Sequence, residues 1–283
     1  MRIIVLRAMR PVDRLREGAG ELARGHYENR IEMRGHDELA ELAGDFNTMA
    51  DAIEANITHL NEKTIRQQTF INDLSHEMKT PVTSILLSAE TLRDRNVPKE
   101  MLDHLLTRIY DQVKWLELLS QKLMTLVLLQ QKLDLREERV SALIDAVRET
   151  SEDALREQGI TLVTSCQADT LWMDFDLMRS ALVNLVMNAK SASSFGQSVE
   201  LRAYARVIEV IEHGKGIEAE DIPLVTEPFY RVDRARSKKH GGAGLGLTLV
   251  KHIAEAHRAR LVIQSVVSQG TIVRLEFLPK DEE

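Results

Sequence analysis

The 283-residue sequence has little of what marks several classes of protein. It contains one cysteine, Cys166, which excludes an intrachain disulfide framework and indicates a reducing compartment. Aromatic residues make up 4%, which argues against an all-β sandwich and against a platform that stacks nucleic-acid bases. The net charge is −7, so the chain has no global attraction to DNA or RNA and we expect no nucleic-acid partner. No apolar run approaches the roughly 20 residues that span a bilayer.

What the sequence does contain first is a short apolar segment with a basic flank. Residues 3–6 are apolar, and arginines follow at positions 7, 10, 14 and 16. Basic residues collect on the cytoplasmic side of membrane helices. Residues 1–7 are therefore either the end of a membrane helix or an ordinary helix start, and the residues alone favour neither. The segment is too short to act as a signal peptide.

Apolar spacing predicts that the first half of the chain is helical. Residues 8–24 read as a helix that ends at Gly25, and residues 26–35 read as irregular or extended. A second helix is expected to begin near Asp37 and Glu38, because acidic side chains suit the positive end of a helix dipole.

The second helix carries a heptad seam as far as residue 92. Nine of twelve seam positions between residues 53 and 92 are apolar, and this sustained 4,3 spacing indicates a coiled coil or helical bundle. Asn96–Pro98 breaks the helix, and a second apolar seam runs from Leu102 to Leu133. Two long helices joined by a short turn form an antiparallel hairpin. Both apolar faces are too wide to be buried within one hairpin, so a four-helix dimer is expected.

The pattern of apolar residues changes near Leu135–Arg139, where a separate α/β domain is expected to begin. Short β-like runs alternate with helical runs beyond this point. The predicted strands are 160–164, 199–204, 207–211, 261–265 and 271–277, and the predicted helices are 141–157, 176–190 and 245–257.

One histidine lies off the seam of the first long helix. In the heptad defined by Ile71, Leu74 and Met78, His76 falls at position f, which faces solvent. An ordinary surface histidine would also sit there. The adjacent Glu77 could instead accept a proton from the ring and leave its other nitrogen as a nucleophile. Thr80 lies one turn further on the same face.

Three later motifs have the chemistry of a nucleotide site. Asn184 and Asn188 lie one turn apart, and their amide oxygens could reach one Mg²⁺ ion. Glu212-His213-Gly214-Lys215-Gly216 follows an apolar strand, and its glycines allow close approach of backbone to a ligand. The glycine-rich residues 241–246 open onto a helix N-terminus, which favours an anion. Each motif taken alone also fits an ordinary helix face or turn.

In their order along the chain, these motifs resemble a known family. The string from His76 to Pro81 (HEMKTP) resembles the phosphoacceptor box of sensor histidine kinases. Residues 37–42 (DELAEL), followed by Phe46–Met49 (FNTM), resemble the second helix of a HAMP linker, and Pro11 matches the proline near the start of the first HAMP helix. The resemblance extends from about residue 8 to 278.

The resemblance implies a multidomain α and α/β fold. HAMP-like helices would occupy residues 1–56, with the possible end of a membrane helix at 1–7. Residues 57–137 would form the antiparallel hairpin for dimerisation and histidine phosphotransfer, giving a dimeric four-helix bundle. Residues 138–283 would form an α/β sandwich ATP-binding domain of the type shared by Hsp90, gyrase, MutL and histidine kinases.

The implied activity is that of a sensor histidine kinase in a two-component system. ATP would phosphorylate His76 with Glu77 as base and Thr80 beside them. The phosphoryl group would then pass to an aspartate in the receiver domain of a response regulator. The implied assembly is a homodimer. The sequence as given would be cytoplasmic, and the parent protein would meet the membrane only through a missing N-terminal segment.

The implied ATP-binding residues come from four short sequence motifs. Asn188 would hold Mg²⁺, Asn184 would help to line the site, and Glu212 would accept a hydrogen bond from the adenine amino group. Arg231 would point at the phosphates. The full implied set is Asn184, Asn188, Lys190, Glu212, Gly214, Gly216, Phe229, Arg231, Gly242, Gly244, Leu245 and Gly246.

Several positions depart from the family pattern. Ser191 stands where many relatives have lysine, and Glu212 and His213 replace the usual aspartate and asparagine. No glycine, proline or asparagine separates the predicted strands between Val199 and Ile211, which predicts a shortened or strained connection. The segment from His257 to Arg260 also lacks glycine, which predicts a left-handed residue at Arg258 or Ala259.

These departures motivate an alternative function. A kinase-impaired sensor could act as a response-regulator phosphatase or as a scaffold, and His76 and Thr80 would serve a phosphatase equally well. A second alternative is an ATPase of the Hsp90 or MutL type. The acceptor box within a coiled coil argues against it.

Overall fold

The structure, a computed structural model, describes residues 2–32, 37–93, 97–129, 133–232 and 244–279. It divides into two compact units, Met1–Asp73 and Leu74–Glu283. Within the described residues, no helix combines the length and apolar content that a membrane span requires.

The helices of the first unit begin and end where local signals place them. α1 spans Arg2–Ala23, so it begins earlier than the predicted residue 8. Gly25 follows with φ of +93°, which ends the helix as expected. α2 begins at Glu38, and the Asp37 Oδ1 atom accepts a hydrogen bond from the Ala40 N–H at 3.0 Å. The predicted start near Asp37 and Glu38 is confirmed.

The first unit has a small apolar centre where the connector between its helices meets α2. Ile31 is buried, as are Ala43 and Ala50 on α2. A Cβ atom at Gly18 of α1 would lie 2.5 Å from the Ile31 side chain, so this contact needs a glycine. Small residues let the connector lie close to both helices.

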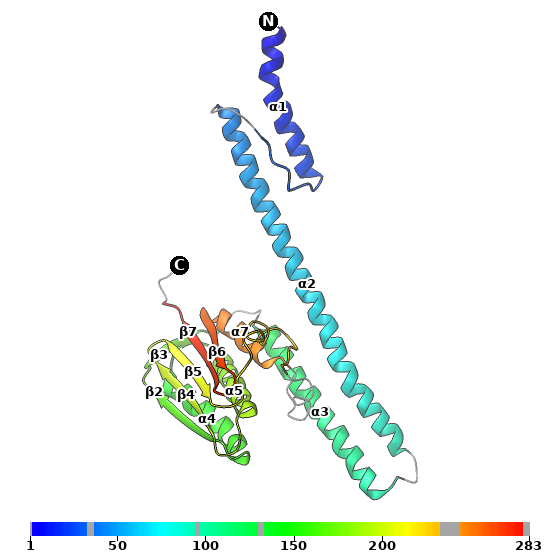
Figure 1. Cartoon of the computed structure of the whole chain (residues 1–283), viewed down its shortest axis with the longest axis vertical. Coiled ribbons are helices and arrows are strands. Elements are labelled where there is room, and N and C mark those ends of the chain that lie inside the picture. Colours follow the sequence, from blue (N-terminus) through cyan, green and yellow to red (C-terminus); the bar gives the residue numbers. More distant parts are fainter. Residues whose placement is uncertain (1, 33–36, 94–96, 130–132, 233–243, 280–283) are drawn as a thin grey trace. The chain divides into compact units, whose positions relative to one another are not determined.

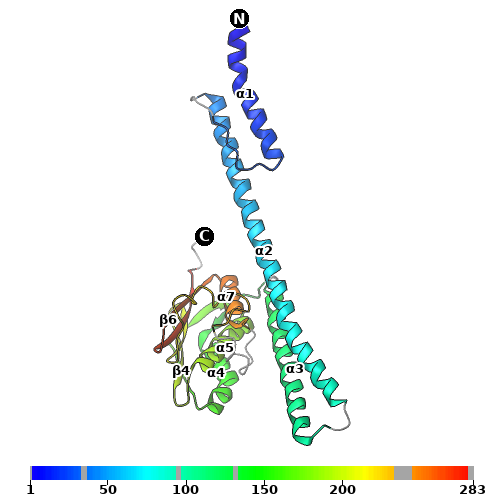
Figure 2. The same cartoon turned by 45° about the vertical axis from the view of Figure 1, so that its right-hand side comes forward.

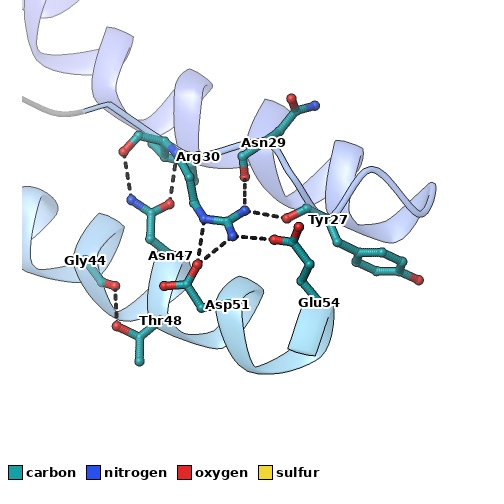
Figure 3. A network of polar contacts seen from close by, with 9 residues as sticks. Tyr27, Asn29, Arg30, Gly44, Asn47, Thr48, Asp51 and Glu54 are labelled. Carbon is teal, nitrogen blue, oxygen red and sulfur yellow. Dashed lines mark hydrogen bonds and ion pairs between the residues drawn. The ribbon is translucent and has the colours of Figure 1, made fainter. Parts of the chain in front are cut away.

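Polar contacts fasten the same connector to α2 (Figure 3). The Asn47 side chain hydrogen-bonds to both backbone polar groups of Ile31. It accepts from the Ile31 N–H at 2.9 Å and donates to the Ile31 carbonyl at 3.1 Å. The Arg30 guanidinium reaches Asp51 at 2.9 Å from Nε and Glu54 at 2.7 Å from Nη2. Two successive turns of α2, from Asn47 to Glu54, therefore hold two successive connector residues.

The second unit begins with the antiparallel hairpin that the two seams predict. α2 continues through Pro81 to Leu92, and α3 spans Lys99–Leu128. Figure 2 shows the two helices side by side, and the Arg108 Nε–H donates to Ser84 Oγ across them at 2.8 Å. One detail of the sequence interpretation is wrong: α3 ends at Leu128, so Leu133 lies beyond it.

The remainder of the second unit is an α/β domain with a five-stranded sheet (Figure 1). The strands are ordered β2-β4-β5-β7-β6; β2 and β4 are parallel and the other pairs are antiparallel. A two-stranded sheet pairs β1 with β3. The strand bounds are β1 Arg136–Arg139, β2 Thr161–Cys166, β3 Thr170–Met173, β4 Ser198–Tyr204, β5 Val207–Glu212, β6 Ala259–Val266 and β7 Gly270–Phe277. β1 and β3 were not predicted.

Three helices pack on one face of the larger sheet. They are α4 (Val140–Glu157), α5 (Phe175–Ala192) and α7 (Gly246–Ala256). Their apolar faces and the inner sheet residues form one continuous core, and Leu126 and Leu129 near the end of α3 pack against it. The family-level fold expected from the sequence, helices followed by an α/β sandwich, is confirmed.

Both predicted backbone strains are present. β4 and β5 are joined by only two residues, Ala205 and Arg206, and Ala205 has φ of +45°. A two-residue hairpin needs positive φ in its turn, and no glycine supplies it here. Arg258, between α7 and β6, has φ of +53°. The shortened connection and the left-handed residue at Arg258 are thus confirmed.

Candidate functional site

His76 lies on the solvent side of its helix, as its heptad position predicts. Its side chain is exposed, Glu77 is partly buried and the following Pro81 is buried. The Thr80 hydroxyl donates to the His76 backbone carbonyl at 3.4 Å rather than to the ring. A neutral imidazole has one N–H donor and one nitrogen lone pair, so an exposed ring can act as a nucleophile.

The two asparagines of α5 meet the first residue of α7. A Cβ atom at Gly246 would lie 3.4 Å from Asn184 Oδ1, 3.4 Å from Asn188 Nδ2 and 3.5 Å from Asn188 Oδ1. The Asn184 amide nitrogen donates to the Ser180 carbonyl at 2.8 Å, which directs its oxygen to the α7 side. Glycine at the start of α7 therefore brings backbone N–H groups next to two amide oxygens.

Glu212 ends β5 with its carboxylate inside the domain. The residue is 4% exposed. Its Oε2 atom accepts a hydrogen bond from the Gly214 N–H, and its Oε1 atom is buried without a hydrogen-bond partner among the described residues. A buried carboxylate oxygen without a partner costs free energy. A ligand N–H group would remove that cost.

The loop after Glu212 is hemmed in by backbone, which explains its glycines. A Cβ atom at Gly214 would lie 2.0 Å from the Ala192 carbonyl oxygen at the end of α5. A Cβ atom at Gly216 would lie 2.3 Å from the Val266 carbonyl oxygen in β6. The loop is thus confined between the end of α5 and the edge of the sheet.

A third close approach lies at the start of α7. The Phe229 N–H donates to the Gly244 carbonyl at 3.0 Å, and a Cβ atom at Gly244 would lie 2.8 Å from the Phe229 backbone. Phe229 has φ of +62° and Gly244 has φ of +70°. Leu245, the N-cap residue of α7, is fully buried. Two segments far apart in sequence therefore meet directly before α7.

Lys190 and Arg231 are partly buried, and the Ser191 hydroxyl donates to the Met187 carbonyl at 3.0 Å. Gly242 lies outside the described residues. The structure therefore brings Asn184, Asn188 and Gly246 together, places Glu212 against Gly214, and places Phe229 against Gly244.

Sequence reasoning missed three polar side chains around this site. Thr271 of β7 lies opposite Glu212 and is buried, and its hydroxyl bonds with Ser265 at 2.9 Å. Gln197 donates to the His213 carbonyl at 2.7 Å. The β alternation of residues 271–277 could have placed Thr271 on the inner face. Nothing in the sequence pattern singles out Gln197.

The residues present fit a nucleotide with its metal ion. The buried, unpartnered Oε1 atom of Glu212 suits an N–H donor on a base. The N-terminus of α7 next to Asn184 and Asn188 suits phosphates and a cation, because helix N-termini attract anions and amide oxygens ligate Mg²⁺. Gly214, Gly216 and Gly244 let the backbone segments around the site pack closely, because a Cβ atom at each would lie within 2.8 Å of neighbouring backbone.

Comparison with protein families matches three stretches of the chain. Residues 173–282 match the family "Histidine kinase-, DNA gyrase B-, and HSP90-like ATPase", which contains all of the candidate nucleotide residues. Residues 66–132 match the "His Kinase A (phospho-acceptor) domain", which contains His76. Residues 3–55 match the HAMP domain.

Whole-chain comparisons point the same way. The chain is 30% identical to the sensor histidine kinase YkoH of Bacillus subtilis over 97% of its own length and 60% of YkoH. It spans 47–60% of the length of the sensor proteins with which it shares 29–32% identity.

Solved structures share the fold at lower sequence identity. Acinetobacter baumannii histidine kinase AdeS has a TM-score of 0.56 and 22% identity over 72% of this chain and 98% of that chain. Histidine kinase ThkA in complex with response regulator protein TrrA has a TM-score of 0.59 and 19% identity over 79% of this chain and 63% of that chain.

Proposed function

Because the chain belongs to the HAMP-containing sensor histidine kinases, we propose that it binds ATP in its α/β domain and becomes phosphorylated on His76. The observation that carries this proposal is that residues from separate sequence motifs lie together in the α/β domain. Asn184 and Asn188 meet the first residue of α7, and the same domain holds a buried Glu212 oxygen ready for a base.

The proposed phosphoryl transfer uses the exposed ring of His76. The ring nitrogen that carries the lone pair attacks the γ-phosphorus, a nitrogen–phosphorus bond forms, and the bond to the ADP oxygen breaks. ADP takes the electron pair of that bond, and the proton of the imidazolium ring passes to Glu77. Such transfers depend mainly on positioning and on neutralisation of charge.

The residues proposed to hold the nucleotide are those whose geometry fits. Glu212 would accept from the base, and the α7 N-terminus at Leu245 and Gly246 would receive phosphate oxygens. Asn188 would hold Mg²⁺, with Asn184 beside it. When bound, Mg²⁺ neutralises charge on the phosphates. Close packing of the backbone around the site requires glycine at Gly214, Gly216 and Gly244. The hydrogen bond from the Phe229 N–H to Gly244 holds the segment that leads to Arg231.

The proposed partners are a second copy of the chain and a response regulator. Exposed apolar seam residues on α2 and α3, Met78 and Leu102 among them, support a dimeric four-helix bundle. ThkA was solved with the response regulator TrrA. By analogy, the phosphoryl group would pass from His76 to an aspartate of a receiver domain.

The domain limits remain part of the proposal. Residues 1–56 would act as a HAMP linker, residues 57–137 as the phosphotransfer hairpin and residues 138–283 as the ATP-binding domain. The HAMP segment would bias the bundle between conformations.

Incubation of the chain with γ-labelled ATP and Mg²⁺ tests the proposal. Label that is lost in acid and kept in alkali is the expected result, because a phosphorus–nitrogen bond is acid-labile. Bound ATP without any such label would overturn the kinase function and support the kinase-impaired alternative. Failure to bind ATP at millimolar concentration would overturn the whole proposal.

A further inference from the structure

The peptide group between His213 and Gly214 is held at both of its polar ends. Its N–H, which belongs to Gly214, donates to Glu212 Oε2. Its carbonyl, which belongs to His213, accepts from the Gln197 Nε2 atom at 2.7 Å. Gln197 and Glu212 therefore grip opposite ends of a single peptide plane.

A peptide group is rigid, so fixing its carbonyl also fixes its N–H. The six atoms lie in one plane and the C=O and N–H bonds point in opposite directions. The direction of the Gly214 N–H decides where one oxygen of the Glu212 carboxylate is held, and this sets the direction of the other oxygen. Oε2 is engaged, and this leaves Oε1 as the buried oxygen that has no partner among the described residues.

Gln197 is itself tied to the end of α5. Its Oε1 atom accepts from the Ser194 N–H at 2.6 Å, and its backbone N–H donates to the Ser194 carbonyl at 3.2 Å. The Lys215 N–H donates to the Ala192 carbonyl at 3.4 Å, next to Gly214. Hydrogen bonds thus hold the loop after Glu212 against the end of α5, the helix that carries Asn184 and Asn188.

We propose that Gln197 is a positioning residue, which sets the His213–Gly214 peptide so that Glu212 presents Oε1 to the nucleotide base. This inference rests on the proposed ATP site. Gln197 acts through the peptide and does not touch the nucleotide. Its loss should weaken recognition of the base and leave recognition of the phosphates unchanged.

Four variants of the full chain test this role. Gln197→Met removes both polar ends of the side chain. Gln197→Glu keeps the acceptor for Ser194 but loses the donor to His213. Gln197→Lys keeps a donor for His213 but loses the acceptor. Gln264→Met is the matched control, because the Gln264 Oε1 atom accepts from Arg274 at 2.9 Å on an exposed part of the same domain.

The measurement is competition against a fluorescent ATP analogue by adenosine, which has no phosphates, and by tripolyphosphate, which has no base. For Gln197→Met and Gln197→Glu we expect the dissociation constant of adenosine to rise about threefold to tenfold, as loss of one hydrogen bond implies. Tripolyphosphate should bind as in the wild type. Gln197→Lys and Gln264→Met should leave both constants within twofold of wild type.

The outcomes separate this inference from the proposed function. If the wild type binds neither the analogue nor adenosine, the ATP site itself is wrong. If the wild type binds and Gln197→Met binds adenosine equally well, the positioning role is wrong. Equal losses for adenosine and tripolyphosphate would show general loosening of the domain and would also overturn it. If Gln197→Met lowers the melting temperature more than the control does, the Glu and Lys variants decide by their difference.

Discussion

The helical part of the chain and its α/β domain bury their apolar residues in different ways. In the α/β domain one core runs through α4, α5, α7 and the inner face of the sheet. In the described part of Met1–Asp73, only Ile31, Ala43 and Ala50 are buried apolar residues. Large apolar side chains on α2 and α3 stay at the surface, including Met78 at 43% and Val113 at 50% exposed.

This difference shows that the two parts have different requirements for stability. The α/β domain completes its core within one chain. The long helices leave large apolar side chains exposed in the single chain, and the proposed second copy would cover them. The first unit compensates locally with polar contacts, since Asn47 and Arg30 hold the connector where few apolar contacts do so (Figure 3).

The largest effect is expected for a substitution at His76, which should abolish phosphorylation of the hairpin without affecting ATP binding by the α/β domain. His76→Gln removes the proposed nucleophile on the hairpin and leaves the α/β domain unaltered. We expect acid-labile labelling to disappear, while the dissociation constant for Mg-ATP stays within twofold of wild type. His59→Gln, an exposed histidine on the same helix, is the control and should be labelled normally. Labelling that survives in His76→Gln would place the acceptor elsewhere.

The second test targets the open seam. We expect the wild type to sediment as a dimer at micromolar concentration. Leu102→Asp should raise the dimer dissociation constant by about two orders of magnitude, because a buried unpaired charge costs several kcal/mol. Val267→Asp, at an exposed position of the α/β domain, should leave the dimer intact. A well-folded wild-type monomer at micromolar concentration would contradict the four-helix interpretation.

A third test asks whether the α/β site is tuned by the length of one side chain. The Glu212 carboxylate turns back onto the Gly214 N–H. The extra methylene of glutamate should push the base outward, so Glu212→Asp should let the base lie deeper and tighten Mg-ATP binding by about tenfold to a hundredfold.

Calorimetric titration measures this effect, and the same strand offers a matched control. Glu209 is also buried in β5, but it faces the other side of the sheet and pairs with Arg274 at 2.8 Å. Glu209→Asp should leave the affinity unchanged. Equal affinities for Glu212→Asp and wild type would show that the pocket accommodates glutamate.

A smaller effect is expected in the connector, where hydrogen bonds and ion pairs can be compared directly. Asn47→Ala removes both hydrogen bonds to Ile31, at about 0.5–1.5 kcal/mol each. Amide exchange at Ile31, measured by NMR or mass spectrometry, should accelerate by about fivefold to a hundredfold. Arg30→Met should accelerate it less, because exposed ion pairs contribute little. The reverse order would show that the ion pairs hold the connector.

The smallest effect concerns the pH dependence of the α/β domain. His257 is buried at the end of α7, where its Nδ1–H donates to the Ile253 carbonyl at 2.7 Å and its Nε2 accepts from the Asp174 N–H at 2.9 Å. Burial lowers the pKa of the His257 ring. As pH falls below about 6.5, the unfolded chain takes up this proton before the folded one does.

The His257 contribution to stability is therefore present above about pH 6.5 and is lost as pH falls towards the folded pKa. Thermal unfolding between pH 7.5 and 5.5 should show a larger fall in melting temperature for wild type than for His257→Gln. His252→Gln, an exposed histidine on the same helix, should behave as wild type. Equal slopes for wild type and His257→Gln would refute the assignment.

Periodicity predicted most of the fold because most elements are long enough to show it. The run 207–211 became β5 at Val207–Glu212, and 141–157 became α4 at Val140–Glu157. β1 was missed because its four residues, Arg-Glu-Glu-Arg, have no apolar alternation; its pairing with β3 specifies it. Tertiary pairing overrides local preference in such short strands.

The candidate site was predictable where its residues form ordered motifs. Asn184 and Asn188 could be named from their spacing, and Glu212 from the resemblance of its motif to the family's adenine-binding box. The contact that holds the Glu212 loop could not, because Gln197 reaches His213 across 16 residues. The bond from the Asp174 N–H to His257, at the start of α5, likewise spans 83 residues. Such contacts depend on how the sheet and helices pack, and a single sequence carries no signal for them.

The two-residue turn at Ala205 and Arg206 fixes the pairing register of β4 and β5. It is too short to let β4 and β5 slide past each other, so the pairing of Tyr204 with Val207 sets that of Val199 with Glu212. Side chains alternate between faces along a strand, and a slip of one residue would send the Glu212 carboxylate from the core to solvent. The strained backbone at Ala205 therefore keeps Glu212 on the face of β5 that the proposed base recognition requires.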